Sequence, residues 1–358
     1  MVKPYSELSS NAQNAYADLF DSIVSINLNS MISLNGSFGK KVIRGKNYWY
    51  FQFRDIDSKV KQIYVGPDSD KLKSLINQQQ TSSVSVKPIR AMAEAAVVLG
   101  CDAILNKHFR VIRRLSEYGF FKHGGILVGT HAYLTMCNML GIYSSENMQT
   151  QDVDFAHAGK NISIAMPSNI TVKTVEAIDS LEMGLIPITN TDGKFGATYL
   201  NPSDPAFRID FLTSKNSIED NPVYIPGLNV SLQPLKFMEF SMIDTLQSVI
   251  FCNEGAVLVN IPKPDRFAIH KLIVSQERKQ SETAKINKDV RQANVLIQYY
   301  LDHRHDELIE TCLEAIGRGS GWEKRLIGGL DALSKINPSA VEDILESIRV
   351  SSAPKLKQ

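Results

Sequence analysis

The spacing of apolar and polar positions changes several times along the chain and divides it into helical and extended stretches. Apolar residues recur at helical spacing over 6–30, which predicts a helix. Residues 40–67 alternate instead, are rich in aromatic and β-branched side chains and contain two turn signals, so they predict a meander of about three strands. A further helix is expected at 69–79, and the polar stretch 78–86 is typical of a linker.

The rest of the chain mixes both patterns before it becomes helical. The expected strands and hairpins are 126–128, 152–155, 184–200 (turning at Asn190–Gly193), 207–212 and 245–261 (turning at Asn253–Gly255). The expected helices are 87–99, 102–118, 131–140, 170–182, 265–278, 283–303, 305–316, 322–335 and 338–348. The pattern predicts an α+β protein with a mixed-sheet core at 115–262, a flanking N-terminal α+β segment at 1–114 and a C-terminal helical bundle at 263–358.

Composition adds little to this outline. The chain has 358 residues, of which 43% are hydrophobic and 22% charged, as in ordinary globular proteins. The formal net charge is +1, so any surface that binds nucleic acid must gather its charge locally. The four cysteines are far apart, which favours reduced, mostly buried thiols. Without a secretory signal or a run of about 18 apolar residues, we expect a cytoplasmic protein with no membrane span.

Gly129 and Thr130 stand between a short apolar strand and a helix. A helix that begins directly after a strand presents unpaired backbone N–H groups, which makes its start a site for anions. Glycine lets a phosphate approach the backbone closely, and threonine can cap the helix or donate to a phosphate oxygen. Many turns of this kind bind nothing, so the pair gains meaning only from its surroundings.

Three aspartates interrupt apolar strands. Asp152 and Asp154 are two apart, so both carboxylates point to one face of their strand, where they repel each other unless a cation or water intervenes. Asp210 lies in a strand whose apolar residues face the opposite side. A solvated strand end, or a pairing of Asp210 with Arg208, is the simpler explanation for each acid alone. Three such acids downstream of a Gly-Thr helix start match the needs of two-metal phosphoryl transfer.

These features together carry a family resemblance. The runs GGILVGTHAYLTMCNMLGIY, TQDVDF and FRIDFLT resemble the DNA polymerase beta-like nucleotidyltransferase superfamily, and within it bacterial nucleotidyltransferase-like proteins related to abortive-infection toxins. The resemblance extends through Pro262–Leu272 to about residue 300, roughly half the chain. Thr130 stands where many members have serine, and the 55 residues between Asp154 and Asp210 form a long connection.

The resemblance implies a nucleotidyltransferase-type core and a magnesium-dependent transfer of a nucleoside monophosphate from a nucleoside triphosphate to an acceptor hydroxyl. It implies that Asp152 and Asp154 ligate two Mg²⁺ ions, for which Mn²⁺ can substitute. Asp210 would ligate the catalytic ion and serve as, or orient, the base. Gly129 and Thr130 would hold the terminal phosphates.

Basic residues follow the core on two expected helices. Lys271 and Arg278 are seven apart and share a helix face, and Lys288 lies on the next helix beside Asp289. A solvated amphipathic face is the ordinary explanation. The related toxins, however, use a lysine and a lysine–aspartate pair after the core, so we expect Lys271, Arg278 and Lys288 to contact phosphates. His270 could coordinate a metal or contact a base, but a core or capping histidine is the expected role.

The meander interleaves basic residues with aromatic ones, which is a composition suited to RNA. Its basic residues include Lys40, Lys41, Arg44 and Lys46. The alternative is a small sheet whose aromatic residues form its core on one face, either Tyr48 with Tyr50 or Trp49 with Phe51. The resemblance implies an RNA acceptor, tRNA first, with protein side chains and small molecules as other candidates. The rival hypothesis is a non-catalytic binding or regulatory protein of the same fold, against which the three intact aspartates argue.

Overall fold

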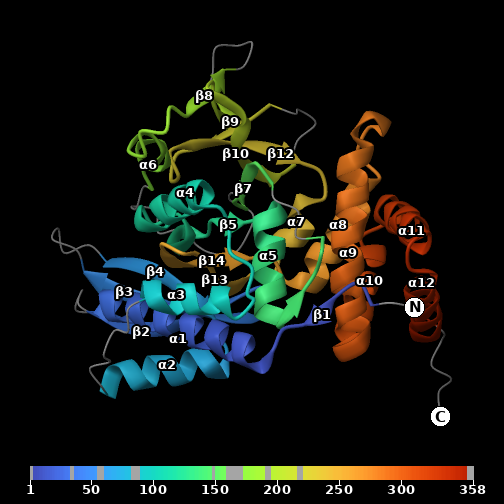
Figure 1. The fold of residues 1–358 in the computed structure, drawn as a ribbon, viewed down its shortest axis with the longest axis horizontal. Coiled ribbons are helices and arrows are strands. Elements are labelled where there is room, and N and C mark those ends of the chain that lie inside the picture. Colours follow the sequence, from blue (N-terminus) through green and yellow to red (C-terminus); the bar gives the residue numbers. More distant parts are fainter. Residues whose placement is uncertain are drawn as a thin grey trace.

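The protein is described by a computed structural model that covers residues 3–32, 36–54, 60–81, 89–146, 150–158, 172–189, 195–215 and 221–352. The expected turn at Asn190–Gly193 and most of the expected linker lie outside these residues. The structure is a mixed α+β fold, as the sequence predicts: N-terminal helices and a small sheet, a central mixed sheet, and a block of C-terminal helices (Figure 1).

The N-terminal part consists of helices around a three-stranded antiparallel sheet. Its elements are α1 (Ser10–Ile32), β2 (Gly36–Ile43), β3 (Lys46–Arg54), β4 (Val60–Pro67), α2 (Asp70–Thr81) and α3 (Ile89–Val98). The strand order β2-β3-β4 confirms the meander that the alternation predicts. The helix predicted at 102–118 is confirmed as α4 (Asn106–Glu117), which begins four residues later than expected.

Both faces of the meander are covered, so the expectation that only one aromatic set is core was wrong. Phe51 packs against apolar residues of α1 and α2 on one face. Tyr48, Tyr50 and Tyr64 form a separate buried cluster on the other. The meander therefore is a packed layer, because α1 and α2 cover one face while the rest of the molecule covers the other.

The central sheet holds seven strands. They are β5 (Ile126–Leu127), β7 (Asp152–Ala156), β8 (Ile186–Thr189), β9 (Phe195–Asn201), β10 (Asp204–Ser214), β11 (Val223–Ile225) and β12 (Val230–Leu235). Their order is β11-β12-β10-β7-β5, and β9 with β8 pairs along the other half of β10. β10 is parallel to both β7 and β12, whereas β5 is antiparallel to β7. Two helices join these strands, α5 (Gly129–Leu140) and α6 (Thr174–Asp179).

Several short elements have no counterpart in the sequence pattern. β11, β12 and α7 (Met238–Met242) lie in a stretch where no element was expected. β12 does alternate buried and half-buried residues, but it is six residues long and contains Pro234, which weakens any strand signal. β1 (Ser6–Glu7) pairs with β6 (Ile142–Tyr143), and two-residue strands carry no periodicity at all.

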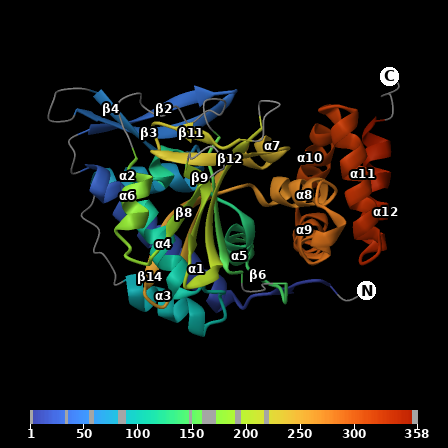
Figure 2. The ribbon, with the colours of Figure 1, turned by 90° about the horizontal axis from the view of Figure 1, so that it is seen from above.

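The C-terminal third confirms the predicted hairpin and all five predicted helices. These are β13 (Leu246–Cys252), β14 (Gly255–Ile261), α8 (Pro264–Ser275), α9 (Thr283–His303), α10 (His305–Gly317), α11 (Ser320–Ser334) and α12 (Pro338–Ser352). The helices α8–α12 gather on one side of the molecule, with α5 between them and the central sheet (Figure 2). Tyr133 of α5 stacks on Phe267 of α8, with ring centroids 6.5 Å apart. One apolar core therefore runs from the sheet into the helical block.

Two sequence expectations concern the chain as a whole. All four cysteines are free and buried, as expected from their spacing. Over the described ranges, none of the helices combines the length and apolar character needed to cross a bilayer.

The N-terminal residues reach the helical block, where the Tyr5 hydroxyl donates to Asp302 Oδ2 of α9 at 2.6 Å.

Candidate functional site

A pocket of about 550 Å³ opens where the central sheet, the start of α5 and the helices α8 and α9 meet. Pockets of this size hold small-molecule ligands in many proteins. It is lined by all eight residues that the sequence singled out: Gly129, Thr130, Asp152, Asp154, Asp210, Lys271, Arg278 and Lys288. Residues separated by up to 159 positions in the chain thus share one cavity.

Asp154 and Asp210 are neighbours across two parallel strands. In the register of β7 and β10, Asp154 pairs with Asp210 and Asp152 with Arg208. Register partners on parallel strands face the same side, so the two carboxylates stand next to each other. The alternate residues of both strands, such as Val153 and Ile209, are fully buried on the other face. The period of two that the sequence analysis used is therefore observed in both strands.

Asp210 also has a neighbour on its other side. Thr198 of β9 is its antiparallel register partner, and the Thr198 hydroxyl donates to Asp210 Oδ1 at 2.5 Å. Burial raises the pKa of Asp210, and this hydrogen bond works against the rise. The sequence analysis missed Thr198, because local sequence patterns do not show that β9 pairs with β10.

Gly129 lies directly against Asp154. Its φ is +65°, in the left-handed region, and a Cβ added there would lie 2.0 Å from Asp154 Oδ2. The backbone N–H of Val128 donates to the Asp154 carbonyl oxygen at 3.0 Å, which ties the strand end to β7. Both the backbone conformation and the space therefore demand glycine.

The structure corrects one expectation for Thr130. α5 begins at Gly129, its N-cap residue is Val128, and no side chain caps it. Thr130 is the second residue of the helix and is 5% exposed, so it does not serve as the cap. Gly129 and Thr130, the first two residues of α5, line the pocket together with Asp154. The start of this helix, which carries a partial positive charge, therefore faces the pocket.

The carboxyl groups on the acidic side of the pocket are close enough to disfavour one another's ionisation. Burial, followed by repulsion from Asp210 and Asp152, raises the pKa of Asp154 to about 7, and Lys271 and Lys288 oppose this shift. Among the described residues, no group of three or more His, Cys, Asp or Glu side chains is already arranged to hold a metal ion. The donor chemistry nevertheless fits a hard divalent cation, because three carboxylates line one cavity and the most buried of them resists ionisation without a counter-charge.

A basic wall faces the aspartates from α8 and α9. Lys271 Nζ donates to Asp289 Oδ1 at 2.5 Å, and Arg278 Nε donates to Asp289 Oδ2 at 2.7 Å. The Asp289 side chain is only 3% exposed. Although burial works against its charge, Lys271 and Arg278 hold the pKa of Asp289 below its usual range. Asp289 thus fixes two cations at the pocket, a role signalled in the sequence only by its place after Lys288.

Lys288 and His270 complete this wall. Burial, followed by the charge of Lys271, lowers the pKa of Lys288, whereas Asp154 and Asp289 oppose the shift. His270 was expected to be a core or capping residue, but it lines the pocket in the middle of α8. Its ring nitrogens are shielded from water and have no hydrogen-bond partner in the described structure, and burial lowers its pKa to about 3. The imidazole is therefore neutral at pH 7.

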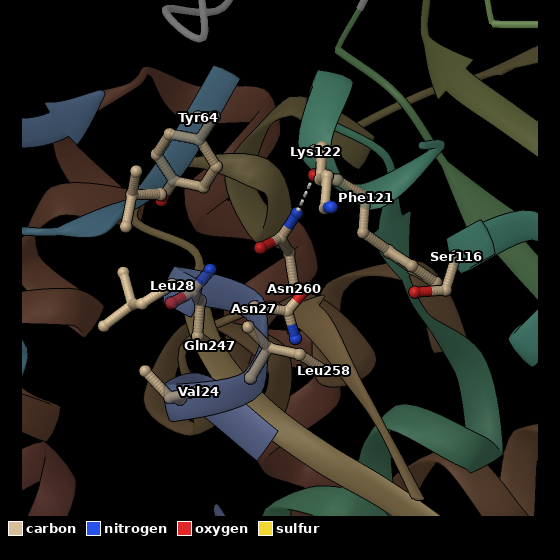
Figure 3. Close-up of a pocket in the computed structure, with 11 residues that line it drawn as sticks. Val24, Asn27, Leu28, Tyr64, Ser116, Phe121, Lys122, Gln247, Leu258 and Asn260 are labelled. Atoms are coloured by element: carbon tan, nitrogen blue, oxygen red, sulfur yellow. Dashed lines mark hydrogen bonds between the residues drawn. The ribbon is translucent and has the colours of Figure 1, made fainter. Parts of the chain in front are cut away.

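A second cavity lies elsewhere, between α1, β4, the 3₁₀ turn Phe121–His123 and the β13–β14 hairpin. Figure 3 shows its lining, with Asn260 donating to the Phe121 carbonyl oxygen at 2.7 Å. Its volume is about 30 Å³, enough for a few water molecules at most. It is too small for a nucleotide, and none of the expected site residues lines it.

Comparison with known proteins agrees with the geometry of the larger pocket. A family model described as Nucleotidyltransferase matches residues 106–317, more than half of the chain. No curated protein and no solved structure matches. The matched segment runs from α4 to α10 and contains every residue that lines the pocket. The chain therefore belongs to the nucleotidyltransferase family.

Proposed function

We propose that this protein transfers a nucleoside monophosphate from a nucleoside triphosphate to an acceptor hydroxyl. The observation that carries the proposal is the parallel register of Asp154 and Asp210, which places two carboxylates side by side in a pocket whose opposite wall is basic. A triphosphate and its metal ions need this combination, because the metal requires hard anionic ligands and the phosphate oxygens require cations.

Asp152, Asp154 and Asp210 would hold two Mg²⁺ ions, with Mn²⁺ as a substitute. When bound, the ions supply charge neutralisation at the phosphates and lower the pKa of the acceptor hydroxyl. The backbone N–H groups at the start of α5, from Gly129 and Thr130, would receive the terminal phosphates, as helix starts commonly do. Asp210, held by Thr198, would accept or direct the proton of the attacking hydroxyl.

Lys271, Arg278 and Lys288 would contact the phosphates from the other wall. Lys271 and Arg278 are kept in place by their shared carboxylate, Asp289, so that they meet a triphosphate without first losing side-chain freedom. Lys288 also lines the pocket, and the charges of Asp154 and Asp289 both favour its charged form.

The test is an incubation of the purified protein and Mg²⁺ with each labelled nucleoside triphosphate, in the presence of total cellular RNA and protein. Label should appear in one acceptor class with the parent protein and disappear with Asp154→Asn. An Asp154→Asn variant that labels as fast as the parent rules out the carboxylate mechanism. Binding of nucleoside triphosphate without any transfer supports the alternative of a non-catalytic binding or regulatory protein.

For the acceptor, we propose an RNA hydroxyl, with tRNA as the first candidate. Exposed cations at the pocket support this choice, since the Lys236 and Lys285 side chains are 59% and 64% exposed and both line the cavity. The β2–β4 sheet supports it less, because none of its described residues lines the pocket. Label found only in protein or in a small molecule contradicts the RNA acceptor and leaves the transferase proposal intact.

A further inference from the structure

Asp210 is flanked in the sheet by two different neighbours. On one side stands Asp154 of β7, which repels it, and on the other stands Thr198 of β9, which donates a hydrogen bond to it. The Oγ1–Oδ1 distance is 2.5 Å, and both residues are register partners across antiparallel strands. The contact is therefore built into the pairing of β9 with β10, and does not depend on a mobile loop.

Thr198 is not among the residues that line the pocket, whereas Asp210 is. The threonine therefore acts on a ligand only through the aspartate. Because one carboxylate oxygen is engaged by the hydroxyl, the rotation of the carboxylate is restricted, and the other oxygen stays available to the cavity. Threonine suits this task, since its β-branched side chain has few rotamers in a strand.

The chemical type of the donor matters as well. A lysine or arginine at this place would neutralise Asp210 and compete with a metal ion for it. A hydroxyl orients the carboxylate but adds no charge, so the full negative charge remains for a cation. Hydrogen-bond partners of metal ligands act in this way generally, and their loss typically costs roughly 10–100-fold in metal affinity or activity.

We propose that Thr198 is a positioning residue that fixes the Asp210 carboxylate for divalent-metal binding. The inference rests on the proposed function, because it assumes that Asp210 is a metal ligand. It concerns a residue that does not line the pocket and that no sequence motif includes. It predicts that the hydroxyl of Thr198, and not its bulk, determines how tightly the pocket binds the ion.

The experiment compares Thr198→Val, which keeps the β-branched shape and lacks the hydroxyl, with Thr198→Ser, which keeps the hydroxyl. Mn²⁺ binding to the whole protein is measured by electron paramagnetic resonance, without and with a non-hydrolysable nucleoside triphosphate, and the Mg²⁺ dependence of transfer is measured in parallel. Thr198→Val should raise the half-saturating Mn²⁺ concentration by roughly 10–100-fold. Thr198→Ser should stay close to the parent in Mn²⁺ binding, and melting curves of the metal-free variants check that each remains folded at the temperature of the titration.

Equal weakening by valine and serine, or parent-like Mn²⁺ binding by valine, overturns the inference. Thr198→Ala is a second hydroxyl deletion in case the valine variant does not fold. A parent protein that binds Mn²⁺ but transfers no nucleotide refutes the proposed activity alone, and the role of Thr198 is then decided by the Mn²⁺ titrations. A parent protein that binds no Mn²⁺ even with the nucleotide overturns both.

Discussion

The carboxylate of Asp154 occupies the space that a side chain at position 129 would need. A Cβ on Gly129 would lie 2.0 Å from Asp154 Oδ2, and the φ of Gly129 is +65°. The helix start and the aspartate are therefore in direct contact, with the positive end of α5 against the most strongly perturbed carboxyl group of the pocket. Phosphate and metal subsites would be joined at this point.

We predict that Gly129→Ala abolishes nucleotide transfer and lowers stability. The left-handed backbone costs a non-glycine residue roughly 1–2 kcal/mol, and the new methyl group must displace Asp154. Gly141→Ala is the matched control, because Gly141 has a similar φ of +71° at the other end of α5 and faces the flexible Gln13 side chain. Denaturation curves should show a loss of stability in both variants, whereas nucleotide transfer should persist in Gly141→Ala. Active Gly129→Ala protein contradicts the prediction.

Asp154→Asn should separate stability from activity. The folded-state pKa of about 7 is above the ordinary value of 3.8, so the folded protein keeps a proton on Asp154 that the unfolded chain loses. The contribution of Asp154 to stability is thus present below pH 4 and is lost as pH rises towards 7. Asparagine cannot ionise, so the metal-free variant should be more stable than the parent at pH 8, by roughly 1.4 kcal/mol per pKa unit, and similar to it at pH 4.

The change in the stability of Asp154→Asn is measured by urea midpoints at pH 4 and pH 8, and its loss of activity is measured by nucleotide-transfer assays. Loss of the hydrogen-bond partner of a metal ligand typically costs roughly 10–100-fold, so replacing a ligand itself should cost more than about 100-fold in rate. A variant that is destabilised at both pH values indicates a structural role for the Asp154 carboxylate.

Asp289→Asn should destabilise the protein strongly, in contrast to Asp154→Asn. Removing one partner of a buried ion pair costs roughly 3–5 kcal/mol, and Asp289 is shared by Lys271 and Arg278. Its depressed pKa means that this stability is present above the ordinary carboxyl pKa and disappears as pH falls through the lower folded value. Asp331→Asn, at a side chain that is 74% exposed, is the control and should change little. Equal midpoints for both variants at pH 7 contradict this prediction.

The buried histidines should make the protein sensitive to acid. His131 Nε2 and His108 Nδ1 are 3.0 Å apart, and burial lowers their pKa values to about 3 and about 4. The unfolded chain binds protons at these groups below about pH 6.5, while the folded protein does not until about pH 4, so stability should fall across this window. His108→Asn should reduce the slope of stability against pH. A parent protein with constant stability from pH 6.5 to 4 excludes the effect.

The β2–β3 lysines should be dispensable for RNA. Lys40 lies 4.9 Å from the centroid of the Trp49 ring, and Lys41 lies 4.9 Å from that of Tyr50, so both stabilise the sheet surface. We expect a variant with alanine at Lys40, Lys41, Arg44 and Lys46 to keep the RNA affinity and salt dependence of the parent. Alanine at Lys236 and Lys285, beside the pocket, should weaken binding and flatten the salt slope, since each lost phosphate contact removes counterion release. If the four-fold variant binds RNA more weakly and the Lys236 and Lys285 variant binds like the parent, RNA binding is assigned to the sheet.

Local patterns in the sequence predicted much of the fold and singled out eight residues that line the larger pocket. Helical spacing predicted the C-terminal helices, and the period of two correctly placed Asp152 and Asp154 on one strand face, opposite buried Val153. These features follow from the chain within a few residues of each position, which is why sequence alone suffices. The short β12 was missed for the same reason, since six residues interrupted by Pro234 carry little local signal.

Only the tertiary structure decided which strands and helices are neighbours. Asp210 stands beside Asp154 because β10 pairs in parallel with β7 across 55 intervening residues, and Thr198 reaches Asp210 because β9 pairs with the other edge of β10. Asp289 meets Lys271 and Arg278 because α8 packs against α9. Each of these contacts is selected by the burial of apolar surface over the whole domain, a property that no local spacing of residues contains.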